Sequence, residues 1–221
     1  SFIVCPREAA SPQWGAEHDW APPPPFTLIP TEKYFQPTVE LDRSPNMRHR
    51  RGYISCMATE NPTTERDRII DALTGEWSAI RELVSTFDED DWGAQTPCPG
   101  WSSRDIIAHI IGTESILAGE QTPSSGGEMP SFVRNEIGEL NQAWIEHFRG
   151  VDTAELLDRF DAISGSRAET LRAMSDADFF AESWTPEGKG TYAKFMRIRI
   201  FDCWMHEQDL RDAASAPGGM E

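Results

Sequence analysis

Apolar residues recur at intervals of three and four over most of residues 57–221, and this spacing constrains the fold more than any other feature of the sequence. The first such run lays one apolar stripe along a helix and consists of Ile69, Ile70, Leu73, Trp77, Ile80, Leu83, Val84 and Phe87. No part of this region alternates for long with period two, the pattern of half-buried strands. The sequence therefore predicts an all-α bundle built by packing these stripes together.

Five helical runs are expected, and they cover residues 69–87, 102–117, 132–148, 153–174 and 192–214. Ser102 and Asp105 have the spacing of a capping box, with Asp in place of the usual Glu. The segments between the runs are rich in proline, glycine, serine or acidic residues, so we expect loops or turns there. They include a solvated turn at residues 88–91 and a turn-rich loop at 183–190.

The first 56 residues have a different composition. They hold nine of the 16 prolines, including the run from Pro22 to Pro25, and their six basic and six acidic residues cancel. Proline removes backbone donors and fixes φ, so no long helix or central strand is expected there. We predict a disordered or extended segment over residues 1–57 and one folded domain over residues 58–221. Met57 is a candidate start, and an over-extended gene model is one hypothesis for what precedes it.

The net charge of −17 lies entirely in residues 57–221, as 14 basic and 31 acidic residues. Phosphate binding needs clustered Lys and Arg, so we expect no nucleic-acid partner and no docking on an anionic membrane. No apolar run approaches the ~20 residues of a membrane span. The four cysteines include no C-x-x-C pair and are too sparse for a disulfide scaffold, which favours a reducing cytoplasmic location.

Two histidines lie inside apolar helical runs, where bundle interiors are expected. One such histidine is ordinarily a core residue with a hydrogen bond. Asp202, however, precedes His206 by four residues, so the two share a helix face. With His109 from another helix they make two histidines and one carboxylate, the ligand set of catalytic zinc and of other first-row metals.

Other side chains near these histidines have competing explanations. Asp209, three residues after His206, is a candidate acceptor for an imidazole N–H, or else an ion-pair partner of Arg211 or Arg172. Glu114 lies at an awkward offset from His109 and ranks below Asp202 as a ligand. Asp105 is explained by the helix start.

At these residues the sequence resembles a known family. The segment from Thr96 to Ser102 (TPCPGWS), with Arg104-Asp105 and Ala108-His109, and the later segment R-x-x-D-x-W-x-H-E-Q-D-x-R from Arg199 to Arg211 are similar to the metal-binding domain of mycothiol-dependent maleylpyruvate isomerases. These are DinB-like four-helix bundles. The resemblance covers roughly residues 62–219. It implies such a bundle, with an additional helix in a long connection, and a divalent metal, zinc first, held by His109, Asp202 and His206.

The resemblance also implies a chemistry. Family members use the metal to activate the thiol of a small cofactor such as mycothiol, because a divalent cation stabilises a thiolate. An unsaturated acid or another electrophile is then the expected substrate of an isomerase or S-transferase, in a monomer or homodimer. This chain has Asp202 where the characterised isomerase has Glu. That isomerase also carries a separate C-terminal domain that contributes to its active site, whereas this chain ends at Glu221.

Three hypotheses follow: a thiol-dependent metalloenzyme, a non-catalytic metal-stabilised bundle that binds a ligand or protein partner, and a metal-free bundle with core histidines. Cationic residues at the mouth of the site would favour the first, and the candidates are Arg104, Arg197 and Arg211. Cys98 and Cys203 are interpreted as small buried hydrophobes, Cys203 because it faces about 100° away from Asp202. Trp101 is expected to pack its loop against the bundle.

Overall fold

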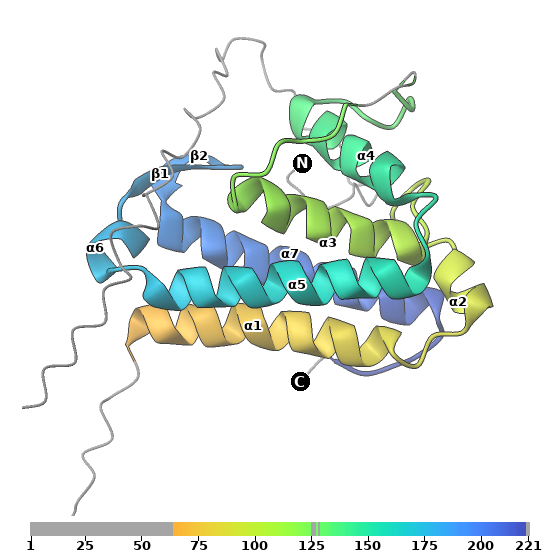
Figure 1. Cartoon of the computed structure of the whole chain (residues 1–221), viewed down its shortest axis with the longest axis horizontal. Coiled ribbons are helices and arrows are strands. Elements are labelled where there is room, and N and C mark those ends of the chain that lie inside the picture. The colour runs from red at the N-terminus through yellow and green to blue at the C-terminus, as the bar shows by residue number, and fades with distance from the viewer. Residues whose placement is uncertain (1–63, 125–126, 128, 220–221) are drawn as a thin grey trace, which may run out of the picture.

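Four long helices form the body of the protein in the computed structural model, which describes residues 64–124, 127 and 129–219. They are α1 (Glu65–Val84), α3 (Ser103–Leu117), α5 (Thr153–Ala173) and α7 (Tyr192–Ala213). Helix α1 contacts α7 and α5, and α3 contacts the same two helices, so the four close a ring. In Figure 1, α1 and α7 run in one direction and α3 and α5 in the other. The predicted four-helix bundle is confirmed, whereas the expectation for residues 1–57 lies outside the described residues.

The additional helix, α4 (Glu136–Phe148), belongs to the long connection between α3 and α5 and packs on the outside of α3 (Figure 1). Gly112 allows this close approach, because a Cβ there would lie 2.4 Å from Cγ of Trp144. Helix α3 is therefore covered by α5 and α7 on one side and by α4 on the other. Its residues from Asp105 to Ser115 are all buried. The predicted start of α4 at Phe132 is early, since the helix begins after the cap Asn135.

The helices begin where side chains satisfy their free N–H groups. Thr64 and Asp67 form a capping box at α1, and Ser102 and Asp105 form the predicted one at α3. Thr191 accepts from the backbone N–H of Lys194 at the start of α7. These caps fix the point along each helix at which its apolar stripe begins.

Two predicted irregular segments contain regular structure. The acidic turn at residues 88–91 is part of a short helix, α2 (Glu89–Gly93), capped by Asp88. The loop expected at 183–190 is a hairpin of β1 (Glu182–Thr185) and β2 (Gly188–Thr191), just after a second short helix, α6 (Asp176–Phe179).

The hairpin forms although its residues show no strand alternation. Gly188 adopts φ +97°, which suits the tight turn at that point. The Thr185 hydroxyl accepts from the N–H of Glu187 and donates to the carbonyl of Gly188. The ring of Trp184 meets Phe195 of α7 edge to face at 6.0 Å. Tertiary packing on α7 and turn chemistry therefore stabilise the strands.

Within the described part of the chain, no helix combines the length and the apolar character needed to cross a bilayer.

Candidate metal centre

The structure brings the three predicted ligands together in the bundle interior. His109 comes from α3, and Asp202 and His206 come from successive turns of α7. All three are fully buried, and one ligand atom of each lies within 4.8 Å of the others. Nε2 of His109 is 3.4 Å from Oδ2 of Asp202, and Nε2 of His206 is 3.7 Å from Oδ1.

Two of these ligand atoms have no hydrogen-bond partner within the described ranges. They are Oδ1 of Asp202 and Nε2 of His206, and they face each other. Their separation of 3.7 Å allows an ion pair but is too long for a hydrogen bond. A buried polar atom without a hydrogen bond costs about 1–3 kcal/mol, so such atoms in a native protein require an explanation. A divalent cation between the carboxylate and the two imidazoles would satisfy both, so the residues fit a metal.

A buried network of ion pairs holds Asp202 in place. This network was not predicted from the sequence. Arg199, one turn before Asp202, is fully buried and donates to Oδ2 of Asp202 and, at 2.9 Å, to Oε1 of Glu114. The other oxygen of Glu114 accepts from Arg167 at 3.1 Å, and Arg167 also donates to the hydroxyl of Tyr192. Glu114 is thus a structural partner of two arginines, consistent with its lower rank as a ligand. The one sequence feature that could have indicated the role of Arg199 is its position three residues before Asp202, on the same helix face.

This environment sets opposite protonation states for the two histidines. Burial lowers the pKa of His109 to about 4, although Asp202 acts in the other direction. Burial also opposes the charge of His206, but the Asp202 carboxylate and the bond to Asp209 outweigh it and raise the pKa of His206 to about 10. Burial likewise opposes ionisation of Asp202, yet Arg199 holds the pKa of that carboxyl well below its usual range. Without metal, a neutral His109 and a protonated His206 therefore flank an ionised Asp202.

Asp209 contacts the other ring nitrogen of His206. Its Oδ2 lies 3.1 Å from Nδ1 of His206, as predicted for an acceptor that orients an imidazole. The two arginines named in the alternative take part in other ion pairs, Arg211 with Glu207 and Arg172 with Asp71.

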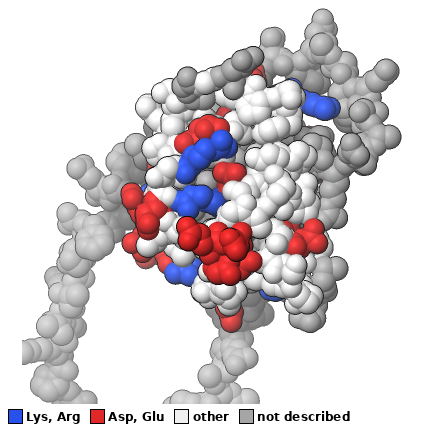
Figure 2. All heavy atoms as spheres, turned by 90° about the vertical axis from the view of Figure 1, so that its right-hand side faces the viewer, with Lys and Arg blue, Asp and Glu red and all other residues white. Residues whose placement is uncertain are grey.

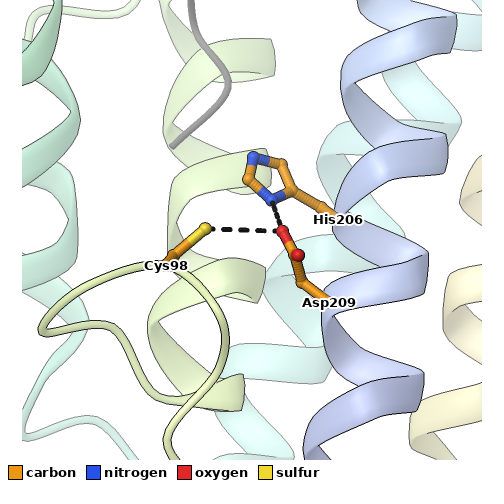
Figure 3. Close-up of side chains that lie close together, drawn as sticks. All are labelled: Cys98, His206 and Asp209. Carbon is orange, nitrogen blue, oxygen red and sulfur yellow. Dashed lines mark hydrogen bonds and ion pairs between the residues drawn. The ribbon is translucent and has the colours of Figure 1, made fainter. Parts of the chain in front are cut away.

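Cys98 also reaches this carboxylate, which corrects its interpretation as a mere buried hydrophobe. Its Sγ lies 3.4 Å from Oδ2 of Asp209, so both partners in Figure 3 point at one oxygen. The contact joins residues 111 positions apart, and sequence spacing could not reveal it. Cys203 is different: its side chain is fully buried beside Arg199 and belongs to neither potential ligand set.

The loop before α3 covers the histidines. The ring centroid of Trp101 lies 5.3 Å from that of His109 and 6.3 Å from that of His206. The loop is closed at its base by a bridge between Gln95 and Ser102. Trp101 thus packs the loop on the bundle as expected, and it does so directly over the two imidazoles.

The arginines proposed for the mouth of the site already have partners. Arg104 donates to the hydroxyl of Thr153, Arg197 pairs with Glu65, and Arg211 pairs with Glu207. Figure 2 shows acidic and basic side chains together on the end of the molecule where α2 lies. The structure gives these three arginines structural contacts and does not assign them to a ligand.

Comparison with known proteins identifies the family. The model for the mycothiol maleylpyruvate isomerase N-terminal domain matches residues 73–211, more than half of the chain. The chain belongs to this family. The matched range contains all three predicted ligands and the loop that covers them.

The chain is also similar to curated proteins of known sequence. Two uncharacterized proteins from strains of Mycobacterium tuberculosis are each 28% identical over 143 residues, which are 64% of this chain and 54% of theirs. The chain thus spans about half the length of these curated relatives.

The crystal structure of the mycothiol-dependent maleylpyruvate isomerase matches at TM-score 0.52 and 18% identity, covering 66% of this chain and 61% of that one. The colibactin self-resistance protein ClbS in complex with a dsDNA matches at TM-score 0.51 and 14% identity, covering 72% and 99%. These similarities show a shared DinB-like bundle.

Proposed function

We propose that this protein binds one divalent metal ion, zinc first among the candidates, through His109, Asp202 and His206. The observation that carries the proposal is that two buried ligand atoms, Oδ1 of Asp202 and Nε2 of His206, make no hydrogen bond and face each other at 3.7 Å beside His109. Two histidines and one carboxylate leave a position open at a four-coordinate ion, the arrangement typical of catalytic zinc.

The residues around the ligands have definite tasks in this proposal. Asp209 accepts from Nδ1 of His206, which directs the lone pair of Nε2 to the metal. Arg199 fixes one oxygen of Asp202 and leaves the other available. His109 is neutral already, whereas His206 must release a proton, so metal binding is coupled to proton release.

We further propose that the bound metal activates the thiol of a small cofactor such as mycothiol, as the family of this chain suggests. A bound divalent cation supplies stabilisation of a thiolate at neutral pH. The protein would then act as an isomerase or thiol S-transferase on an unsaturated acid or another electrophile. The sparse cysteines support a cytoplasmic location.

The alternative is a non-catalytic, metal-stabilised bundle that binds a ligand or protein partner. The tight cover of Trp101 over both imidazoles favours this alternative, since a substrate needs that loop to move. The solved neighbour in complex with DNA makes nucleic acid a ligand to test. The net charge of −17 and the mixed charges in Figure 2 favour a small molecule instead.

Metal analysis and thermal shift test the proposal. We expect about one zinc per chain in purified protein and a lower melting temperature after chelation, because a ligand of the folded state alone stabilises it. His109→Ala and His206→Ala should lose the metal, whereas His147→Ala, which alters a histidine outside the set, should keep it. Unchanged occupancy in the first two variants would refute the ligand assignment.

The two functional alternatives are separated by adding mycothiol. Metal-dependent stabilisation by the thiol, followed by turnover of an electrophile, supports the enzyme. Stabilisation by metal alone, with no thiol effect, supports the non-catalytic bundle.

A further inference from the structure

We infer that Cys98, His206 and Asp209 form a second metal position, which takes a thiophilic cation such as Cd²⁺. One ligand atom of each lies within 4.8 Å of the others, and the side chains are at most 4% exposed. Figure 3 shows how they meet: the thiol comes from the loop before α3, and the imidazole and carboxylate come from α7. A thiolate ligand selects soft cations, and an imidazole and a carboxylate can complete the coordination of such an ion.

The protein holds the thiol in place through its backbone. The N–H of Cys98 donates to the hydroxyl of Thr96 at 3.2 Å. Its carbonyl accepts from the side chain of Gln95 at 2.8 Å and from the N–H of Trp101 at 3.1 Å. The other two ligands lie three residues apart on one helix face. All three are thus positioned by hydrogen-bonded or helical backbone before an ion arrives, which lowers the entropic cost of binding.

Charge favours this position for a soft ion. When its thiol proton has left, the set offers a thiolate and a carboxylate, which together neutralise a buried dication. The set of His109, Asp202 and His206 offers one carboxylate, and Arg199 already binds one of its oxygens. A thiophilic ion therefore gains both a softer ligand and better charge compensation beside Cys98.

The two positions share one imidazole, and this makes them competitors. Nε2 of His206 faces Asp202, and Nδ1 faces Asp209. A neutral imidazole has one proton and one lone pair, so it ligates through one nitrogen at a time. An ion beside Cys98 uses Nδ1, moves the ring proton to Nε2 and withdraws His206 from the first set. An excess of a soft metal should consequently displace zinc from the proposed centre.

The test titrates Cd²⁺ into the metal-free full chain, with Cys5 and Cys56 changed to Ser so that only the two buried thiols remain. The readout is the ultraviolet charge-transfer absorbance of a cadmium–thiolate bond. We expect a band that saturates at one Cd²⁺ per chain and disappears in Cys98→Ser. Cys203→Ser is the matched control and should keep it. Asp209→Asn should weaken Cd²⁺ binding at least about tenfold, since even outer-shell partners of a metal site contribute that much.

The outcomes separate this inference from the proposed function. His109→Ala should lose zinc but keep the cadmium band, because His109 belongs only to the first set. No band in the Cys98-containing protein, or a band that survives Cys98→Ser, would overturn the inference. If one of these results is obtained and His109→Ala still abolishes zinc binding, the second metal position is refuted and the proposed zinc centre is kept.

Discussion

Helices α1 and α7 lie side by side and run in the same direction (Figure 1), yet they differ in the side chains that they bury. The buried face of α1 is wholly apolar and consists of Ile69, Ile70, Leu73, Trp77, Ile80, Leu83 and Val84. That of α7 mixes apolar residues with the charged or titratable Arg199, Asp202, Cys203, His206, Glu207 and Asp209. Burying α1 stabilises the fold without further partners, whereas α7 depends on each charge finding its partner. The comparison indicates that α1 contributes to stability alone, whereas α7 contributes both to stability and to the site.

The largest effect should come from Arg199 on α7. Arg199→Met retains much of the volume but leaves Glu114 and Asp202 without their shared guanidinium, and removal of one partner from a buried pair costs about 3–5 kcal/mol. Urea denaturation of metal-free protein measures this loss. Arg197→Ala is the matched control, because its pair with Glu65 is largely exposed and is worth about 1 kcal/mol at most. Equal losses in the two variants would contradict the role given to Arg199.

On α1, Leu73→Ala should cost about 2–5 kcal/mol, because it leaves a cavity under a fully buried side chain. It should nevertheless keep the metal content of the unaltered protein, since α1 contributes no ligand to the set. Chemical denaturation and metal analysis on the same samples provide both numbers. A loss of metal in folded Leu73→Ala would show that the packing of α1 also controls metal binding, which would contradict the comparison.

A smaller effect concerns pH in the metal-free protein. The pKa of His109 is lowered to about 4 in the folded protein, against about 6.5 in the unfolded chain. The stability that neutral His109 contributes to the fold is therefore lost as the pH falls below about 6.5. The raised pKa of His206 has the opposite effect. The stability that protonated His206 contributes is complete below about pH 6.5 and is lost as the pH rises. Between pH 7.5 and 5.5 the stability lost through His109 and the stability gained through His206 should nearly cancel.

Removal of one histidine exposes that balance. Metal-free His109→Gln should gain about 1 kcal/mol relative to the unaltered protein as pH falls from 7.5 to 5.5. Denaturation curves at the two pH values measure the difference. A variant that follows the pH dependence of the unaltered protein would show that His109 is not held neutral.

The same two helices show how far sequence reasoning extends. The apolar stripe of α1 follows from local spacing, and the start of α3 follows from the capping box of Ser102 and Asp105, whereas α1 begins and ends a few residues before the predicted range of 69–87. The pairing of Asp202 with His206 on α7 was equally predictable, because it is local.

Apart from His109, which was expected beside Asp202 and His206, contacts between distant segments could not be predicted from local spacing. Arg199 could not be distinguished from a surface arginine until Glu114 of α3 was placed beside it. The thiol of Cys98 meets Asp209 only because the covering loop folds back over α7. The hairpin was missed for a similar reason, since packing on α7 stabilises it rather than strand alternation.

The most direct test of the metal centre is anomalous diffraction at the zinc edge from crystals grown with one equivalent of zinc. We predict a single peak at bonding distance, about 2.0–2.2 Å, from nitrogens of His109 and His206 and an oxygen of Asp202. A peak found only beside Cys98, or none at any of these residues, would contradict the proposed centre.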